Sequence, residues 1–235
     1  MDVLADEVHV WVARPAGLTT EELAACERVL SNDERERASR FRFERHRREA
    51  TVSRALVRTT LARYVGRSPI EVAYRVGPYG RPDLDPPGEL AFNSTNHPGL
   101  VAVAVSRARE VGIDTEPLSR ADEILGVAER VFSEPEREAL EALDVEARRD
   151  RAVSLWTSKE AYIKARGLGF SADLHRVVVE FPHTRPPRLR FLGGYDDARG
   201  WDLAFRDVSG FRIAIAQRTL PARERELDVV IREAR

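Results

Sequence analysis

The order of the predicted elements repeats once along the chain of 235 residues, and this repetition limits the folds that the chain can adopt. Each half starts with helical segments, contains one long helix with apolar residues at helical spacing, and ends in short strands separated by turns. The long helices are predicted over 44–65 and 146–166. The pattern predicts an α+β fold of two similar, pseudo-duplicated subdomains, 1–117 and 118–235.

Shorter elements complete the two halves. The first half should contain a strand over 8–13, a helix over 21–30, a capping box in which Ser31 precedes Glu34, and strands over 90–94, 100–106 and 110–116. The last two of these strands are expected to pair as a hairpin around 107–109. In the second half we expect helices over 121–131 and 134–143, and strands over 177–181, 189–192, 201–206 and 211–217, with a final hairpin turning at 209–210.

Composition excludes several classes of protein. With 43% hydrophobic and 33% charged residues, the chain should be globular, and a formal net charge of −1 argues against a dedicated nucleic-acid-binding protein. The single cysteine, Cys26, can form neither an intrachain disulfide nor a thiolate-rich zinc site. The acidic segment 1–7 lacks the apolar core of a secretion signal, and the longest apolar run, 100–105, is too short to span a bilayer. We expect a soluble cytoplasmic protein that binds neither nucleic acid nor membranes.

Two neighbouring carboxylates, Asp114 and Glu116, form the first candidate site. Because side chains alternate along a strand, both should lie on one face. Two acids side by side at the end of an apolar strand are unfavourable unless a cation or solvent compensates, and a hard divalent ion such as Mg²⁺ binds such an oxygen pair. The alternative is a solvated strand end with ordinary surface acids.

A predicted helical face forms the second candidate site. Trp156, Glu160 and Lys164 are four residues apart, so they lie nearly on one face of the helix. Only two of the 38 Lys and Arg residues are lysines, Lys159 and Lys164, and a site that requires a compact ammonium is one explanation. Chance clustering, or a Glu–Lys pair that only supports the helix, is the alternative. Glu160 would add a third carboxylate to a metal site, and Lys164 would suit a phosphate.

A polar turn over 93–99 is the third candidate. It contains Asn96 and His97, and the histidine could bind phosphate or act as a base. An exposed turn histidine with no such role is the commoner case.

The fourth candidate is the basic segment 33–67, which holds eleven arginines against five acids. Arg47 and Arg48 lie in its most concentrated part, and Arg81 in the turn 80–82 could join them. A phosphate-rich ligand, an acidic protein partner or a solvated helix face would each fit this segment.

Taken together, these segments resemble the 4′-phosphopantetheinyl transferases of the surfactin-synthetase-activating (Sfp) type. The matching motifs are Gly80-Arg81-Pro82, Asn96-His97-Pro98-Gly99, Gly112-Ile113-Asp114-Thr115-Glu116, Phe132-Ser133-Glu134-Pro135-Glu136 and Trp156-Thr157-Ser158-Lys159-Glu160-Ala161-Tyr162-Ile163-Lys164. Such enzymes are monomers with a pseudo-duplicated α+β fold and an active site between the halves. They transfer the 4′-phosphopantetheine group of coenzyme A to a serine of an apo acyl or peptidyl carrier protein and release adenosine 3′,5′-bisphosphate.

The resemblance also implies roles for individual residues. Asp114, Glu116 and Glu160 would hold Mg²⁺, or Mn²⁺, on the pyrophosphate of coenzyme A. Glu160, or a water that it orients, would take the proton from the carrier serine, and Lys164 would stabilise charge on the pyrophosphate. The residues implied to bind coenzyme A are Lys164, Arg81, Asn96 and His97, with Arg47 and Arg48 at its nucleotide end.

One motif departs from the family pattern N-x-S-H-[ST]. Asn96 stands where the family has a serine before the histidine, and Asn93 stands one residue further from His97. A one-residue bulge in this strand would restore the geometry. Arg81 stands where the family has a lysine, which keeps the charge.

Two other functions remain open from the residues alone. A Mg²⁺-dependent nuclease would use acids and a lysine over a basic groove, but the lysine expected two residues after the second acid is Leu118 here. A non-catalytic module would bind an acidic partner through the arginine-rich helix and would tolerate loss of Glu160. The natural carrier could belong to fatty-acid, polyketide or nonribosomal-peptide synthesis.

Overall fold

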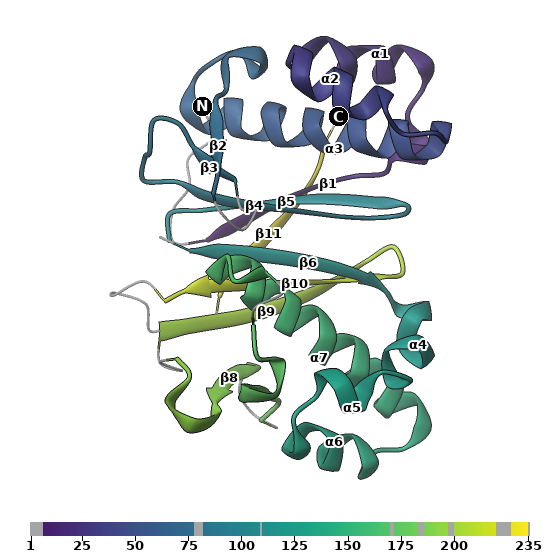
Figure 1. The fold of residues 1–235 in the computed structure, drawn as a ribbon, viewed down its shortest axis with the longest axis vertical. Helices are drawn as coiled ribbons and strands as arrows, with labels where there is room; N and C mark the ends of the chain where they lie inside the picture. Colours follow the sequence, from purple (N-terminus) through teal and green to yellow (C-terminus); the bar gives the residue numbers. More distant parts are fainter. Residues whose placement is uncertain are drawn as a thin grey trace.

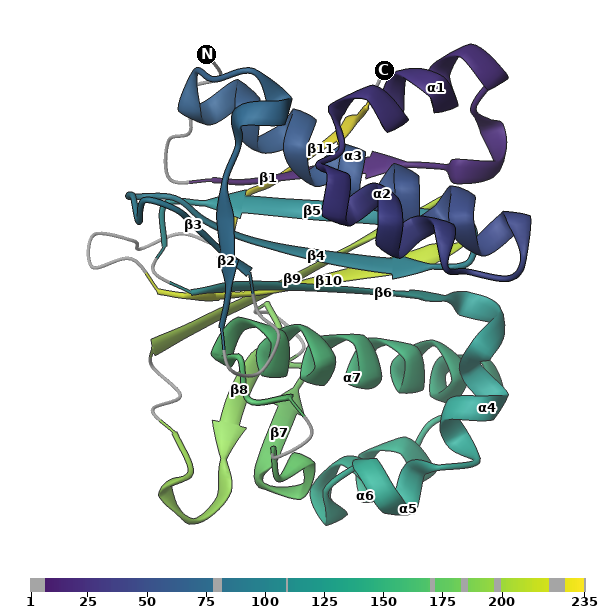
Figure 2. The ribbon, with the colours of Figure 1, turned by 45° about the horizontal axis from the view of Figure 1, so that its top comes forward.

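Two β-sheets face each other between two layers of helices (Figures 1 and 2). The computed structural model describes residues 7–77, 82–108, 110–169, 172–182, 186–196, 200–219 and 227–234. In this part of the chain the first half contains β1 (Val8–Ala13), α1 (Thr20–Val29), α2 (Asn32–Ser39), α3 (Glu44–Val65), β2 (Tyr74–Val76), β3 (Pro82–Leu84), β4 (Ala91–His97) and β5 (Leu100–Ser106). The later elements are β6 (Val111–Pro117), α4 (Ala121–Leu125), α5 (Ala128–Val131), α6 (Glu134–Glu141), α7 (Val145–Arg166), β7 (Val177–Glu180), β8 (Arg188–Phe191), β9 (Trp201–Val208), β10 (Phe211–Arg218) and β11 (Val229–Glu233).

The sheet order joins strands that are distant in sequence. The first sheet has the order β11-β1-β5-β4 and the second has the order β6-β10-β9, while β2–β3 and β7–β8 are separate two-stranded ladders. The hairpin of β9 and β10 turns at Ser209 and Gly210, as predicted. The α+β fold class is therefore confirmed.

The predicted hairpin around 107–109 is wrong. β5 pairs with β1 and β4, whereas β6 pairs with β10, so the chain leaves one sheet after Ser106 and enters the other at Val111. Arg109 lies outside the described residues. A turn signal in the sequence shows where the chain changes direction but not which strand it will pair with.

The longest apolar run of the sequence forms β5, and this strand is buried on both faces. Val101, Val103 and Val105 pack in the cluster beneath α3, while Leu100 and Ala102 pack in the cluster between the sheets. A strand covered on both faces loses the usual alternation of apolar and polar residues. β4 is an edge strand of the first sheet and β6 is an edge strand of the second. These two edges lie next to each other, so β4 and β6 are in contact.

Each half also contains the same polar framework. The capping boxes Ser31–Glu34 and Ser133–Glu136 start α2 and α6, and the first was predicted from the sequence. Each glutamate is buried and pairs with a cation from the long helix: Glu34 with Arg58 at 2.6 Å, and Glu136 with Lys159 at 2.5 Å. Arg58 and Lys159 are each the fifteenth residue of their helices, α3 and α7.

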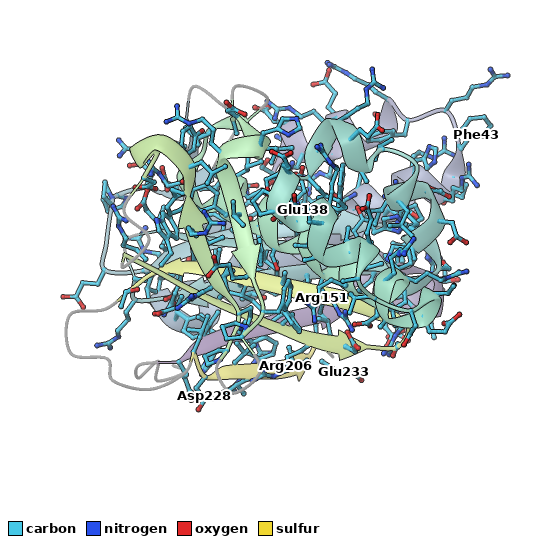
Figure 3. The ribbon with its side chains drawn as sticks, turned by 90° about the horizontal axis from the view of Figure 1, so that it is seen from below. Phe43, Glu138, Arg151, Arg206, Asp228 and Glu233 are labelled. Atoms are coloured by element: carbon cyan, nitrogen blue, oxygen red, sulfur yellow. The ribbon has the colours of Figure 1, made fainter. Side chains whose placement is uncertain are left out.

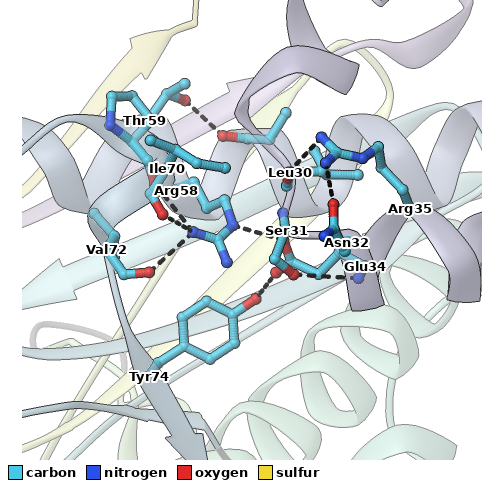
Figure 4. Close-up of polar contacts among 12 residues, drawn as sticks. Leu30, Ser31, Asn32, Glu34, Arg35, Arg58, Thr59, Ile70, Val72 and Tyr74 are labelled. Atoms are coloured by element: carbon cyan, nitrogen blue, oxygen red, sulfur yellow. Dashed lines mark hydrogen bonds and ion pairs between the residues drawn. The ribbon is translucent and has the colours of Figure 1, made fainter.

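Both cations also bind carbonyl groups of the loop that follows the long helix. Arg58 donates to the carbonyls of Pro69, Ile70 and Val72 at 2.9–3.2 Å, and Glu34 accepts a further hydrogen bond from the Tyr74 hydroxyl (Figure 4). Lys159 donates to the carbonyl of Leu174 in the loop after α7, and also to that of Val131 at the end of α5. These contacts fix the long helix, its preceding helices and its following loop as one unit in each half.

The repeat of elements begins with β6, which supports a boundary between β5 and β6. The predicted division at residue 117 falls at the end of β6 and stays a prediction. β11, which the sequence analysis did not predict, follows the second unit but pairs in parallel with β1 of the first, with Val8 opposite Val229. No helix among the described residues combines the length and apolar character needed to cross a membrane.

The first prediction concerns these buried pairs. Lys159→Met should lower the free energy of unfolding by about 3–5 kcal/mol, because the Glu136 carboxylate is left buried without its cation. Arg58→Met is the matched change in the first half and should cost a similar amount. Denaturant titration measures both, and a loss below about 1 kcal/mol for either variant would mean that its pair is not a main constraint on the fold.

Candidate active site

Close contact between α7 and β6 builds the candidate site. A side chain at Gly112 would overlap the carbonyl oxygen of Ala161 and the amide nitrogen of Ala165, so only glycine allows this approach. Glu160 and Lys164 flank Ala161 and Ala165 on α7, and Asp114 follows Gly112 by two residues on β6. The glycine therefore brings the functional groups of the helix onto the acidic face of the strand.

Asp114 and Glu116 lie on the same face of β6, as predicted, and each is paired with polar groups of the chain. The Lys164 ammonium lies 2.6 Å from Oδ1 of Asp114. The Trp156 indole donates to Oε1 of Glu116 at 3.0 Å, and the Arg120 guanidinium lies 2.7 Å from Oε2. Both carboxylates are buried, with residue exposures of 6% and 7%.

The helical face predicted for Trp156, Glu160 and Lys164 is therefore directed at β6. Lys159 is not part of it, because its side chain is 2% exposed and its ammonium pairs with Glu136 on the other side of the helix. The two lysines, five residues apart in sequence, thus have separate roles, and only Lys164 faces the acids.

Burial and neighbouring acids raise the pKa of Asp114 and of Glu160. Burial raises the pKa of Asp114, and Lys164 opposes this shift. Burial also raises the pKa of Glu160, which is further raised by the negative charges of Asp114 and Glu116. Oδ2 of Asp114 is buried and has no hydrogen-bond partner among the described residues. The site holds more negative charge than its own cations satisfy, which is the electrostatic condition for binding a further cation.

The strand β4 forms the second wall of the site and has no bulge. Its seven residues pair with β5 in continuous register from Ala91 opposite Ser106 to His97 opposite Leu100. The predicted bulge that would restore the family spacing is therefore absent. As a result, His97 faces Glu116, with Nε2 3.7 Å from Oε2, and packs against Phe211, whereas Asn96 faces the neighbouring cleft.

Thr95 is a site residue that the sequence analysis missed. Its hydroxyl donates to Oδ1 of Asp114 at 3.2 Å and accepts from the Lys164 ammonium at 3.0 Å. Two positions before it, Oδ1 of Asn93 accepts a hydrogen bond from the backbone N–H of Ile113. Strand alternation from His97 would have indicated these residues, because 93, 95 and 97 share a face.

A cleft of about 960 Å³ opens beside the acids, between the helices of the first half and α7. Its walls include Arg37 from α2, Arg54 from α3, Ser94 and Asn96 from β4, and Glu160 and Lys164 from α7. The volume lies at the upper end of the range for small-molecule sites. A large anionic molecule in this cleft would need cations beside it to approach the acids. Arg37, Arg54 and Lys164 supply such cations.

Arg47 and Arg48 are not among the described residues that line this cleft. Arg47 pairs with Glu44 at 2.6 Å and binds the carbonyls of Phe41 and Arg42, while Arg48 binds the carbonyls of Pro15 and Leu18. Both belong to the start of α3, whose cap residue Phe43 lies at an outer corner of the molecule (Figure 3). Arg81 lies outside the described residues.

Comparison with known proteins identifies the class. Family models for the 4′-phosphopantetheinyl transferase N-terminal region and for the 4′-phosphopantetheinyl transferase superfamily match residues 17–108 and 110–226. The 4′-phosphopantetheinyl transferase HetI of Nostoc sp. is 34% identical over 193 residues, 81% of each chain, and Sfp of Bacillus subtilis strain 168 is 28% identical over 83% of this chain and 88% of its own. A solved holo-(acyl-carrier-protein) synthase from Bacillus anthracis aligns with 46% of this chain and 94% of its own at 23% identity and a TM-score of 0.40.

The fold and the site define an enzyme of two related α+β units with a carboxylate–lysine centre where β4, β6 and α7 meet. The chain belongs to the 4′-phosphopantetheinyl transferase superfamily. The family resemblance predicted from the motifs is confirmed, and the nuclease and the non-catalytic module are no longer supported.

The charge balance of the site gives a prediction for stability. Glu160→Gln should raise the thermal unfolding midpoint of the metal-free protein near pH 7 by ~2–4 °C, since it removes one of three clustered negative charges. A carboxyl whose pKa is raised by folding binds more protons when folded, so its contribution to stability falls as pH rises through the folded-state pKa.

The advantage of the Gln variant should therefore shrink as pH falls below that pKa, where the wild-type carboxyl is already protonated. Calorimetry of both proteins between about pH 5 and 8, a range that starts just above the ordinary pKa of a carboxyl group, tests this. A Gln variant that is less stable at every pH would contradict the assignment of Glu160 to an over-charged cluster.

Proposed function

We propose that this protein transfers the 4′-phosphopantetheine group of coenzyme A to a serine hydroxyl of an apo acyl or peptidyl carrier protein. The observation that carries the proposal is the convergence of three charged groups in a chain of this superfamily. Glu160 and Lys164 line a cleft large enough for coenzyme A, and Asp114 pairs with Lys164 behind them. Coenzyme A is the substrate that donates the group, and adenosine 3′,5′-bisphosphate is the other product.

The proposed step is a displacement at phosphorus. The serine oxygen forms a bond to the phosphorus that bears the pantetheine, and the bond from that phosphorus to the bridging oxygen of the pyrophosphate breaks. The serine proton goes to the base, and the electron pair of the broken bond leaves on adenosine 3′,5′-bisphosphate. Such reactions depend mainly on positioning and on neutralising charge.

Glu160 is the proposed base, directly or through a water that it orients. Burial and the neighbouring acids raise the pKa of its carboxyl, and a base whose pKa is nearer to the working pH is better suited to accept and release a proton. Lys164 is the proposed partner of the pyrophosphate, because its ammonium reaches the same wall of the cleft from α7.

Asp114, Glu116 and Glu160 are the proposed ligands of Mg²⁺, with Mn²⁺ as a possible substitute. The donor set fits a hard divalent ion, and the buried Oδ2 of Asp114, which has no hydrogen-bond partner in the described part of the chain, supplies a free oxygen. Among the described residues these side chains do not form a ready-made group of three metal ligands, because the first two are paired with Lys164 and Arg120. When bound, the ion would act as a Lewis acid on the pyrophosphate.

The proposed coenzyme A contacts follow the cleft. Asn96 and Lys164 keep the role predicted from the motifs, and Arg37 and Arg54 are better placed than Arg47 and Arg48 to meet its phosphates. His97 stays a proposed site residue through its position beside Glu116. The proposal also includes a cytoplasmic monomer that acts in fatty-acid, polyketide or nonribosomal-peptide synthesis.

Intact-protein mass spectrometry of apo carrier proteins tests the reaction. Wild-type protein with coenzyme A and Mg²⁺ should add one phosphopantetheine to at least one carrier, and EDTA should prevent the addition. Glu160→Gln should reduce transfer by about 100-fold or more, since a base contributes on that order. Glu146→Gln, an exposed acid on the same helix, is the matched control and should keep full transfer.

No addition to carriers from all three pathways, together with no coenzyme A binding by calorimetry, would overturn the proposal. Near-normal transfer by Glu160→Gln would remove only the role assigned to that carboxylate.

Lys164→Arg tests whether the site needs an ammonium. The fork of arginine is wider and cannot take the place of a point charge between Thr95 and Asp114, so transfer should fall by about tenfold or more although the charge is kept. Transfer rates measured on one carrier check this, and an unimpaired variant would mean that a positive charge alone is sufficient.

A further inference from the structure

The acid pair at the end of β6 already has two cations of the chain. Lys164 lies 2.6 Å from Oδ1 of Asp114, and Arg120 lies 2.7 Å from Oε2 of Glu116. Among the ion pairs of the described residues, Glu160 has none. Both cations are therefore directed at carboxylates that the proposed function assigns to a divalent ion.

A divalent ion cannot simply be added to this arrangement. An ion held by both carboxylates would lie within a few ångströms of the ammonium and the guanidinium, and repulsion at that distance is strong in a partly buried site. One oxygen of each of these carboxylates is already hydrogen-bonded to its cation. Because of the repulsion, we expect metal binding to displace Lys164 and Arg120 from the acids.

Both side chains are partly exposed to solvent, which leaves them a direction in which to leave the acids. Their exposed fractions are 30% for Lys164 and 33% for Arg120, whereas their carboxylate partners are 8–9% exposed. Arg120 also pairs with the exposed Glu123 at 2.9 Å, so it has a second partner when it leaves Glu116. Lys164 has no second carboxylate among the described ion pairs, but it lines the cleft, where a phosphate oxygen would replace the one that it loses.

We propose that Lys164 and Arg120 compete with divalent cations for Asp114 and Glu116 until the phosphates of coenzyme A bind Lys164. Metal and coenzyme A would then bind cooperatively. This inference rests on the proposed function and deepens it. Because coupling between two ligands is reciprocal, metal should strengthen coenzyme A binding by the same factor by which coenzyme A strengthens metal binding. Arg120 is thereby assigned a role in setting the metal affinity.

Titration with Mn²⁺, followed by electron paramagnetic resonance of the free ion at pH 8, tests the inference without any transfer reaction. In the absence of coenzyme A, Lys164→Met should bind Mn²⁺ about 10- to 100-fold more tightly than wild type, as expected when a charge-assisted hydrogen bond no longer has to be broken. Arg120→Gln should also bind more tightly. Arg149→Gln is the charge control, because Arg149 is a partly exposed cation of α7 that pairs with Asp122 and not with the site.

Coenzyme A supplies the second arm of the experiment. It should strengthen Mn²⁺ binding to the wild type by about tenfold more than it strengthens binding to Lys164→Met, in which only the direct contact between the ion and the pyrophosphate couples the two ligands. Arg120→Gln should keep most of the effect, since its Lys164 is intact.

Three results would overturn the inference. One is Lys164→Met and Arg120→Gln with the Mn²⁺ affinity of the wild type. Another is an equal gain in Arg149→Gln, which would show a general effect of charge. The third is a wild-type Mn²⁺ affinity that coenzyme A changes by no more than it changes the affinity of Lys164→Met. If neither the wild type nor any variant binds Mn²⁺ with coenzyme A present, the metal role in the proposed function is wrong as well, and this outcome is distinct from the others.

Discussion

The absence of a side chain at Gly112 is the constraint on which the site depends. It lets the backbone of α7 rest on β6 near Ala161 and Ala165, and this contact sets the distance at which Lys164 meets Asp114. Any larger residue would separate helix and strand, because the obstacle is backbone that cannot rotate aside. The positions of the charged groups beside the cleft thus depend on a packing requirement at one residue of a buried strand.

The duplicated framework shows which features belong to folding and which to chemistry. Trp11 in β1 and Asp114 in β6 are each the fourth residue of their strands, and Arg63 and Lys164 are each the twentieth residue of their helices. In the first half the guanidinium lies 4.5 Å from the centre of the indole ring, where the second half has an ammonium–carboxylate pair. The same geometry therefore supports a cation–π contact in one half and an ionic centre in the other.

Much of this could be predicted from local sequence. Helix caps, the long helices and the acid pair follow from short-range patterns, and the structure confirms them. The partners of β5 and β6, the pairing of β11 with β1, and the burial of Lys159 depend on contacts between distant segments, which local patterns do not contain. β4 could be predicted in part. Strand alternation already places Asn96 and His97 on opposite faces, whereas the absence of a bulge is visible only in the pairing with β5.

The parallel pairing of β11 with β1 has a consequence for synthesis on the ribosome. The edge of β1 stays open until residues 229–233 have emerged, although every other element of the first half has been made more than a hundred residues earlier. An open strand edge invites pairing with other chains. The first half should therefore be the more aggregation-prone part of the nascent chain, and its sheet can be completed only after the second half has been translated.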